Sequence, residues 1–125
     1  MNVVRFVLCA SALTLMPLSP FAVRHADGAH PIRTVDVVLS RYAFSPDRIE
    51  MRLGEPVRLN VVSTDSVHGF QVKALGLKVR VPGRAAAVTI DLAPGKAGTY
   101  RITCSEYCGS GHSRMQAWLV VTPAT

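Results

Sequence analysis

The sequence predicts an all-β fold in which antiparallel strands form a sandwich or a barrel. Two observations support this prediction. In several short segments, apolar and polar residues alternate along the chain, which is the pattern of half-buried strands. Glycine and proline turns separate these runs, and no stretch beyond the amino-terminal leader has a helical period with caps. Many short strands joined by such turns are typical of β-sandwiches and β-barrels.

The first half of the domain shows the alternation clearly. Apolar residues recur between 35 and 44, and the turn Ser45-Pro46-Asp47 ends this stretch. Residues 48–53 alternate arginine or glutamate with isoleucine, methionine and leucine. After a break at Gly54-Glu55-Pro56, residues 57–61 alternate in the same way. These last two segments are therefore expected to be half-buried strands joined by a turn.

The second half continues the pattern with longer loops. A polar loop leads into Val67-His68-Gly69-Phe70, which we interpret as the entry of a strand, and the mixed stretch that follows is interrupted at Gly76. Turns with glycine and proline precede the next two expected strands, at 87–92 and 99–103, and a loop with two cysteines leads from there to a last strand at 116–122. We place Trp118, in the last of them, in the core.

The chain begins with a predicted targeting segment. Arg5 precedes an uncharged apolar run from 6 to 23, which is the layout of a secretory signal. The run is at the lower limit for spanning a bilayer, and Pro17 and Pro20 would kink a helix, so a cleaved signal is favoured over a retained anchor. We expect a signal peptide or membrane anchor at 1–22, a flexible arm at 23–33 and one domain at 34–125, in the periplasm or on the extracytoplasmic face of the membrane.

The chain is basic, with a formal net charge of +6. The basic residues are spread singly along the expected strands and no nucleic-acid-binding motif accompanies them, so a nucleic-acid partner is excluded from our interpretation. Attraction to an acidic protein surface or to the anionic lipids of a membrane surface stays open. Ordinary solvation of the strand faces is the simpler explanation.

The segment CSEYCGSGHSRM, residues 104–115, carries the chemistry. Cys108, His112 and Met115 could present a thiolate, an imidazole and a thioether to one ion, and a weak methionine ligand beside cysteine and histidine favours electron-transfer copper. Cys104 adds a second thiolate, and two thiolates can bridge two copper ions. A second imidazole is then needed, and His68 is the only histidine in the expected domain outside this loop.

Other interpretations of these residues exist. Cys104 and Cys108 could form a structural disulfide in an oxidising compartment, but this leaves the histidine and methionine unexplained. Zinc is conceivable, although the donor set suits copper better. A terminus beginning Val23-Arg24-His25 after cleavage could bind Cu(II) through nitrogen atoms. Glu106 is a poor candidate for a general acid, because no second catalytic group accompanies it.

His68-Gly69-Phe70, the segment 98–103 and the loop 104–115 together resemble the binuclear copper (CuA) domain of cytochrome c oxidase subunit II, over roughly 34–122. The resemblance implies a cupredoxin-like antiparallel β-sandwich with a Greek-key barrel arrangement. It also implies that Cys104 and Cys108 bridge two copper ions, that His68 and Met115 complete one ion, and that His112 and the main-chain carbonyl of Glu106 complete the other. The Glu106 carboxylate could reach magnesium in a complex with a catalytic subunit.

As a member of this family, the chain would be the electron-entry subunit of a haem-copper terminal oxidase and would perform no catalysis alone. The implied partners are the haem-copper catalytic subunit and a c-type cytochrome or another periplasmic electron donor. Two features depart from the family: the leader is short where one or two membrane helices are usual, and the domain is basic where an acidic docking surface is usual. A free-standing periplasmic CuA carrier, or a copper-delivery or copper-sensing protein, are the alternatives.

Overall fold

The structure is a computed structural model, which describes residues 31–84 and 86–125. In this part of the chain the regular structure consists of nine strands and two short 3-10 turns: β1 (Arg33–Ser40), β2 (Ala43–Ser45), β3 (Arg48–Arg52), β4 (Val57–Ser63), β5 (His68–Val72), η1 (Lys73–Leu75), β6 (Leu77–Val81), β7 (Val88–Leu92), β8 (Gly98–Thr103), η2 (His112–Arg114) and β9 (Gln116–Thr122). The predicted all-β fold is confirmed.

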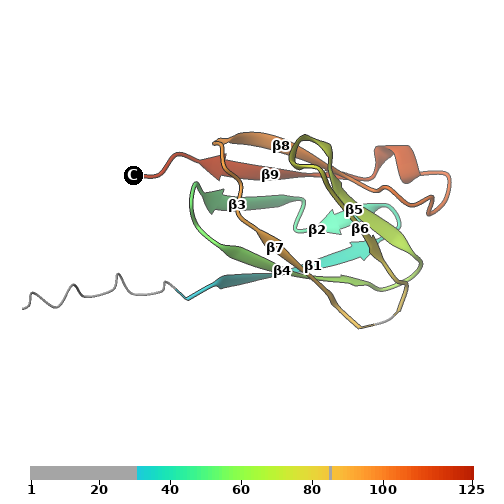
Figure 1. The fold of residues 1–125 in the computed structure, drawn as a ribbon. Coiled ribbons are helices and arrows are strands. Elements are labelled where there is room, and N and C mark those ends of the chain that lie inside the picture. The colour runs from blue at the N-terminus through green and yellow to red at the C-terminus, as the bar shows by residue number, and fades with distance from the viewer. Residues whose placement is uncertain (1–30, 85) are drawn as a thin grey trace, which may run out of the picture.

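The strands form two sheets that face each other across the core (Figure 1). One sheet has four strands in the order β2-β1-β4-β7, and the other has five in the order β3-β9-β8-β5-β6. The two segments expected to be joined by a turn, β3 and β4, separate into different sheets. In these sheets, β1 pairs with β4 in parallel and β3 pairs with β9 in parallel. The sequence predicted antiparallel strands alone, whereas both sheets are mixed.

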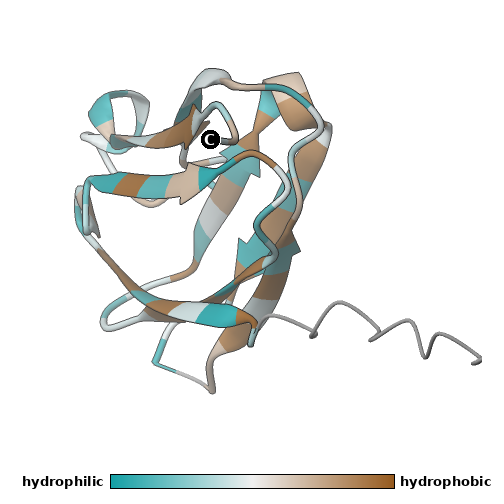
Figure 2. Ribbon diagram, turned by 90° about the vertical axis from the view of Figure 1, so that its left-hand side faces the viewer, coloured by the Kyte–Doolittle hydropathy of each residue, from teal (hydrophilic) through white to brown (hydrophobic). Residues whose placement is uncertain are grey.

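The core lies between the sheets because each strand alternates inward apolar and outward polar residues, which Figure 2 shows as alternating colours along the strands. Leu39, Leu59 and Leu119 are fully buried, and the rings of Phe44 and Phe70 meet edge to face with centroids 6.0 Å apart. Met51, an inward residue of β3, is also buried. Trp118 is 37% exposed on the outer face of β9, so its predicted core position is wrong: its neighbours Ala117 and Leu119 take the inward positions.

The loop between β8 and β9, residues 104–115, lies at the end of the molecule opposite the carboxyl terminus (Figure 1). The predicted leader at 1–22 and most of the predicted arm at 23–33 fall outside the described residues. Within 31–84 and 86–125, no helix is long and apolar enough to cross a membrane.

Truncating a buried leucine tests the two-sheet core. Leu119→Ala should lower the free energy of unfolding by about 2–5 kcal/mol, because Leu119 is fully buried and the lost side chain leaves a cavity. Val38→Ala, at a position 37% exposed on the outer face of β1, is the control and should change it by about 0.5 kcal/mol or less. Chemical denaturation measures both variants, and an equal loss of unfolding free energy in the two would contradict the assignment of Leu119 to the core.

Candidate metal centre

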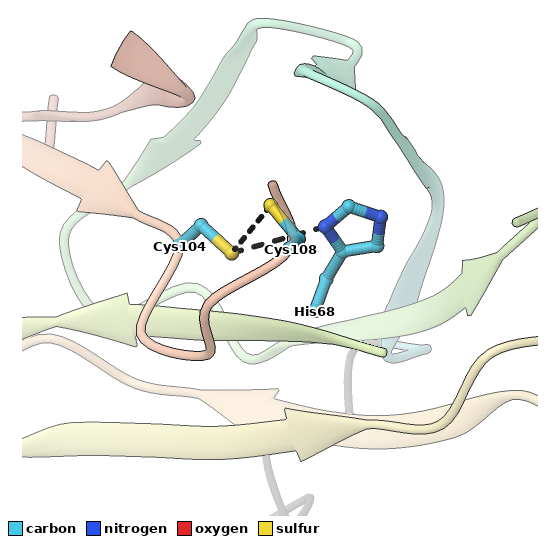
Figure 3. A group of neighbouring side chains, drawn as sticks. All are labelled: His68, Cys104 and Cys108. Atoms are coloured by element: carbon cyan, nitrogen blue, oxygen red, sulfur yellow. Dashed lines mark hydrogen bonds between the residues drawn. The ribbon is translucent and has the colours of Figure 1, made fainter. Parts of the chain in front are cut away.

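Three side chains from distant parts of the sequence converge beside the β8–β9 loop (Figure 3). His68 is the first residue of β5, Cys104 follows the last residue of β8, and Cys108 lies four residues further along the loop. Their donor atoms lie within 4.8 Å of one another, and all three residues are buried. The His68 Nδ1 atom is 3.8 Å from the Cys104 sulfur. The loop and β5 thus supply the mixed nitrogen and sulfur donors that the sequence predicted.

The two cysteine sulfurs lie 3.8 Å apart and are not bonded to each other. A disulfide bond would require about 2.05 Å. The structure therefore contradicts the structural-disulfide interpretation. Two thiolates held about 2.3 Å from a shared tetrahedral ion would lie about 3.8 Å apart, so this separation fits sulfurs that share a metal.

The remaining predicted ligands surround the sulfur pair. The His112 Nδ1 atom and the Met115 Sδ atom each lie 3.9 Å from the Cys108 sulfur. The carbonyl oxygen of Glu106 lies 3.1 Å from the Cys104 sulfur, which donates a hydrogen bond to it. Met115 is 1% exposed, whereas His112 is half-buried and lies beside the Tyr107 ring, which is 80% exposed. All six predicted site residues therefore lie together at this end of the β-sandwich.

The donor chemistry favours copper. Two thiols, two imidazoles and a thioether form a soft set, which copper prefers, and a thioether is a weak ligand typical of electron-transfer copper sites. Burial and the neighbouring Cys104 raise the pKa of the Cys108 thiol to about 11. In the metal-free protein this thiol is therefore protonated at neutral pH, and a bound metal must displace its proton.

A carboxylate orients the His68 ring. The Nε2 atom of His68 lies 2.7 Å from Asp65 Oδ1, so a neutral ring that donates from Nε2 leaves the Nδ1 lone pair facing the sulfurs. Burial raises the pKa of Asp65, but hydrogen bonds from His68, Ser66 and Arg41 outweigh it and hold this pKa well below its usual range. The ring of His68 is itself fully buried.

Arg41 connects this carboxylate to the loop. Its backbone N–H donates to Asp65 Oδ2 at 2.7 Å, and its Nε donates to the carbonyl oxygen of Cys108 at 2.8 Å. One residue thus ties the group that orients His68 to the backbone of a cysteine in the site. Both contacts bring together residues that are distant in sequence.

Glycines let the loop approach its supports closely. A Cβ atom at Gly69 would lie 2.6 Å from the Ser105 backbone nitrogen, and the Gly69 N–H donates to the Cys104 sulfur at 3.4 Å. A Cβ atom at Gly111 would lie 2.3 Å from the Tyr42 ring. The loop therefore packs against β5 and against the segment between β1 and β2 without intervening side chains.

From the sequence we identified the six candidate ligands but not the residues that support them. Asp65 stood only as part of a polar loop, although a carboxylate three residues before a candidate ligand histidine was a usable signal. Arg41 and Tyr42 gave no local signal, because their roles depend on strand β1 ending beside the β8–β9 loop.

Adding one methyl group at position 69 tests the close approach. Gly69→Ala should displace the loop and lower metal affinity at least about tenfold, because backbone atoms leave no room for a Cβ. Gly95→Ala is the matched control, since no atom lies within 4 Å of a Cβ there. Metal titration of both variants measures the effect, and equal affinities would contradict the packing.

Removing the Asp65 carboxylate tests the support of His68. In the metal-free protein at neutral pH, Asp65→Ala should lower the free energy of unfolding by about 2–4 kcal/mol, because the buried His68 ring and the backbone N–H groups of Arg41 and Ser66 lose their acceptor. Asp47→Ala, an exposed carboxylate in the turn before β3, is the control and should change it by about 0.5 kcal/mol or less.

The stability of the Asp65→Ala variant should also depend on pH differently from that of the wild type. Since the pKa of Asp65 is lowered in the folded protein, its stabilisation is complete above the usual carboxyl pKa of about 4 and is lost as the pH falls through the folded value. Urea unfolding between neutral pH and about pH 3 should therefore show a shallower acid loss for Asp65→Ala than for the wild type. If the unfolding free energies of the two proteins fall in parallel as the pH is lowered, the lowered pKa assigned to Asp65 is wrong.

Comparisons with known proteins agree with the geometry. The profile of the family described as "Cytochrome C oxidase subunit II, periplasmic domain" matches residues 32–122. A relative from Thermus thermophilus named "Cytochrome c oxidase subunit 2" is 35% identical over 89 residues, which cover 70% of this chain and 64% of that protein. The chain thus spans less than two thirds of this relative's length.

Two solved structures share the fold. The periplasmic domain of subunit II of the cytochrome oxidase of Bradyrhizobium japonicum superposes with a TM-score of 0.65 at 16% identity, covering 73% of this chain and 84% of that one. A heme-copper terminal oxidase dimer contains a chain that matches with a TM-score of 0.59 at 23% identity, covering 86% of this chain and 76% of that one. These likenesses confirm the predicted cupredoxin-like β-sandwich. Together with the match over 32–122, they show that the chain belongs to the family of cytochrome c oxidase subunit II periplasmic domains.

Proposed function

We propose that this domain transfers electrons through a binuclear CuA copper centre held by Cys104, Cys108, His68, His112, Met115 and the main-chain carbonyl of Glu106. One observation carries the proposal: two buried thiols lie 3.8 Å apart without a bond, and each has an imidazole nitrogen within 4 Å. A single-copper site needs only one thiolate. The second thiolate gives a pair of copper ions two sulfurs to share.

When bound, the copper pair supplies a centre that accepts and releases one electron at a time. The protein's own contribution is to hold the ligands still. His68 is fixed by Asp65, Cys104 by the Gly69 N–H, and the loop backbone by Arg41, so the ligands rearrange little when the charge changes. Burial of the sulfurs and of Met115 keeps water away from one side of the site.

Met115 is the strongest argument against zinc. Its sulfur lies 3.9 Å from the Cys108 sulfur in a fully packed position, where the side chain faces the other donors. Zinc sites in proteins are built from cysteine, histidine and carboxylate ligands, and a thioether adds nothing to them. Copper sites use such a thioether as a weak ligand that adjusts the redox potential.

Membership of the family supports a proposal about the complex in which the domain acts. We infer that it serves as subunit II of a haem-copper terminal oxidase, on the extracytoplasmic side of the membrane, and passes electrons to the catalytic subunit. In that complex the carboxylate of Glu106 is the candidate magnesium ligand at the interface. Co-purification with a haem-copper subunit tests the assignment, and isolation of the protein alone with an intact copper centre would favour the free-standing carrier.

Ligand substitutions test the copper pair. The oxidised copper-loaded protein should be purple and show hyperfine coupling to two equivalent copper nuclei in its electron paramagnetic resonance spectrum. His112→Ala and Cys108→Ser should each abolish this spectrum, because each removes a strong ligand. Met115→Leu should keep two coppers and shift the redox potential, because the thioether is the weak ligand.

Met51→Leu is the matched control for the methionine variant. Met51 is equally buried but lies in β3, outside the set of donors, so its substitution should leave both the spectrum and the potential unchanged. A colourless wild-type protein that binds a single Cu(I) would overturn the electron-transfer proposal. Loss of one copper in Met115→Leu would overturn the ranking of the ligands.

A further inference from the structure

The charges on the two outer sheet faces differ strongly. The face of the sheet β3-β9-β8-β5-β6 carries five basic residues and one acidic residue, Glu50, at its outward positions: Arg48, Arg52, Lys78, Arg80 and Arg101. The outer face of the sheet β2-β1-β4-β7 carries Asp36, Arg58 and Asp91, of which the last two form an ion pair. We call the first of these surfaces the basic face. Its charge was not visible from the sequence, where the basic residues are spread singly.

An exposed tryptophan lies between two arginines of the basic face. Trp118 on β9 is in register with Arg48 of β3 on one side and with Arg101 of β8 on the other. The guanidinium carbon of Arg101 lies 5.5 Å from the centroid of the Trp118 ring, within cation–π range. Trp118 is nevertheless 37% exposed. Tryptophan and arginine are the residues most enriched among those that dominate binding at protein interfaces.

The basic face adjoins the candidate copper site. Strands β8 and β9 run side by side into the loop that holds the cysteines (Figure 1). Arg101 precedes Cys104 by three residues and Trp118 follows Met115 by three, which along a strand is about 10 Å. A protein bound over Trp118 would therefore lie next to the copper ligands, which is where an electron-transfer partner has to lie.

Most of the positive charge on this face has no partner within the domain. Among the ion pairs between described residues, Arg48 binds Glu50, while Arg52, Lys78, Arg80 and Arg101 take part in none. Such a surface attracts anionic partners and repels cationic ones, and it speeds the encounter with the former.

We propose that the basic face is the docking surface for an acidic redox protein that exchanges electrons with the copper pair. This proposal rests on the proposed function and names the partner's chemistry: a negatively charged surface around its own redox group. An anionic membrane would also be attracted by the charge. The position of Trp118 beside the copper loop favours a redox protein, because a lipid surface would gain nothing from that proximity.

The single tryptophan of the chain gives a direct test, because it lies on the basic face and its fluorescence reports on binding there. The full chain, both metal-free and copper-loaded, is titrated with an acidic monohaem cytochrome c and with a basic one of similar size. Quenching of Trp118 by the haem measures binding to the metal-free form, and calorimetry measures binding to both forms. The acidic cytochrome should bind at least about tenfold more tightly, with affinity falling as salt is added.

Paired charge reversals locate the surface. Arg80→Glu/Arg101→Glu should weaken binding of the acidic cytochrome at least about tenfold. Lys73→Glu/Lys96→Glu makes the same change in net charge at exposed residues outside the face and should weaken it less than about threefold. Thermal unfolding confirms that both variants are folded.

Three results would overturn the proposal: equal binding of both cytochromes, equal loss in both double variants, or binding of phosphatidylserine vesicles with no binding of the acidic cytochrome. Since docking is measured on the metal-free chain as well, it is separable from the copper assignment. A normal binuclear spectrum without docking would refute the docking face alone. If the chain binds the acidic cytochrome but shows no binuclear copper spectrum, the proposed copper centre is wrong. The basic face then remains a binding surface for anionic proteins, with no electron transfer to a copper pair.

Discussion

The site depends on the close approach of the β8–β9 loop to the first residues of β5. Gly69 has no room for a Cβ atom against the Ser105 backbone, and its N–H reaches the Cys104 sulfur at 3.4 Å. This contact places the first cysteine beside His68, which precedes Gly69 in the chain. Because the loop starts from β8 and ends in β9, two neighbours of the same sheet, the second cysteine and Met115 are carried to the same place.

A second set of contacts, outside the sulfur pair, holds the candidate ligands in place. Asp65 fixes the His68 ring, and Arg41 joins Asp65 to the carbonyl oxygen of Cys108. These polar groups lie at the end of the barrel, where strands end and buried donors need acceptors. Asp65 and Arg41 therefore have two effects. They provide hydrogen-bond partners for polar groups at this end of the sandwich, and they orient the candidate ligands. A change that lowers the stability of the fold here should also disturb the geometry of the candidate ligands.

Most strands could be predicted from the sequence because alternation is a local pattern, as in β3 and β4, although the segment that forms β6 stood only within a mixed stretch. The candidate ligands of the loop 104–115 could be proposed from their offsets, and the structure brings them together with His68. The sequence did not predict which strands pair, since the parallel pairing of β1 with β4 and of β3 with β9 depends on packing between distant segments. Trp118 was misplaced because size and apolar character suggested burial, whereas the pleat of β9 turns it outward. Arg41 and the basic face likewise became visible only in three dimensions, whereas Asp65 left a local signal three residues before His68.

The proposed function requires this fold to hold two copper ions with the help of both Cys104 and Cys108. Native mass spectrometry of the chain, loaded with copper in the presence of competing zinc, tests this requirement most directly, because it counts and identifies the bound metals in one measurement. We expect two copper atoms and no zinc on each chain, and we expect both coppers to be lost in Cys104→Ser. A single metal ion per chain, or zinc in place of copper, would contradict the proposed function.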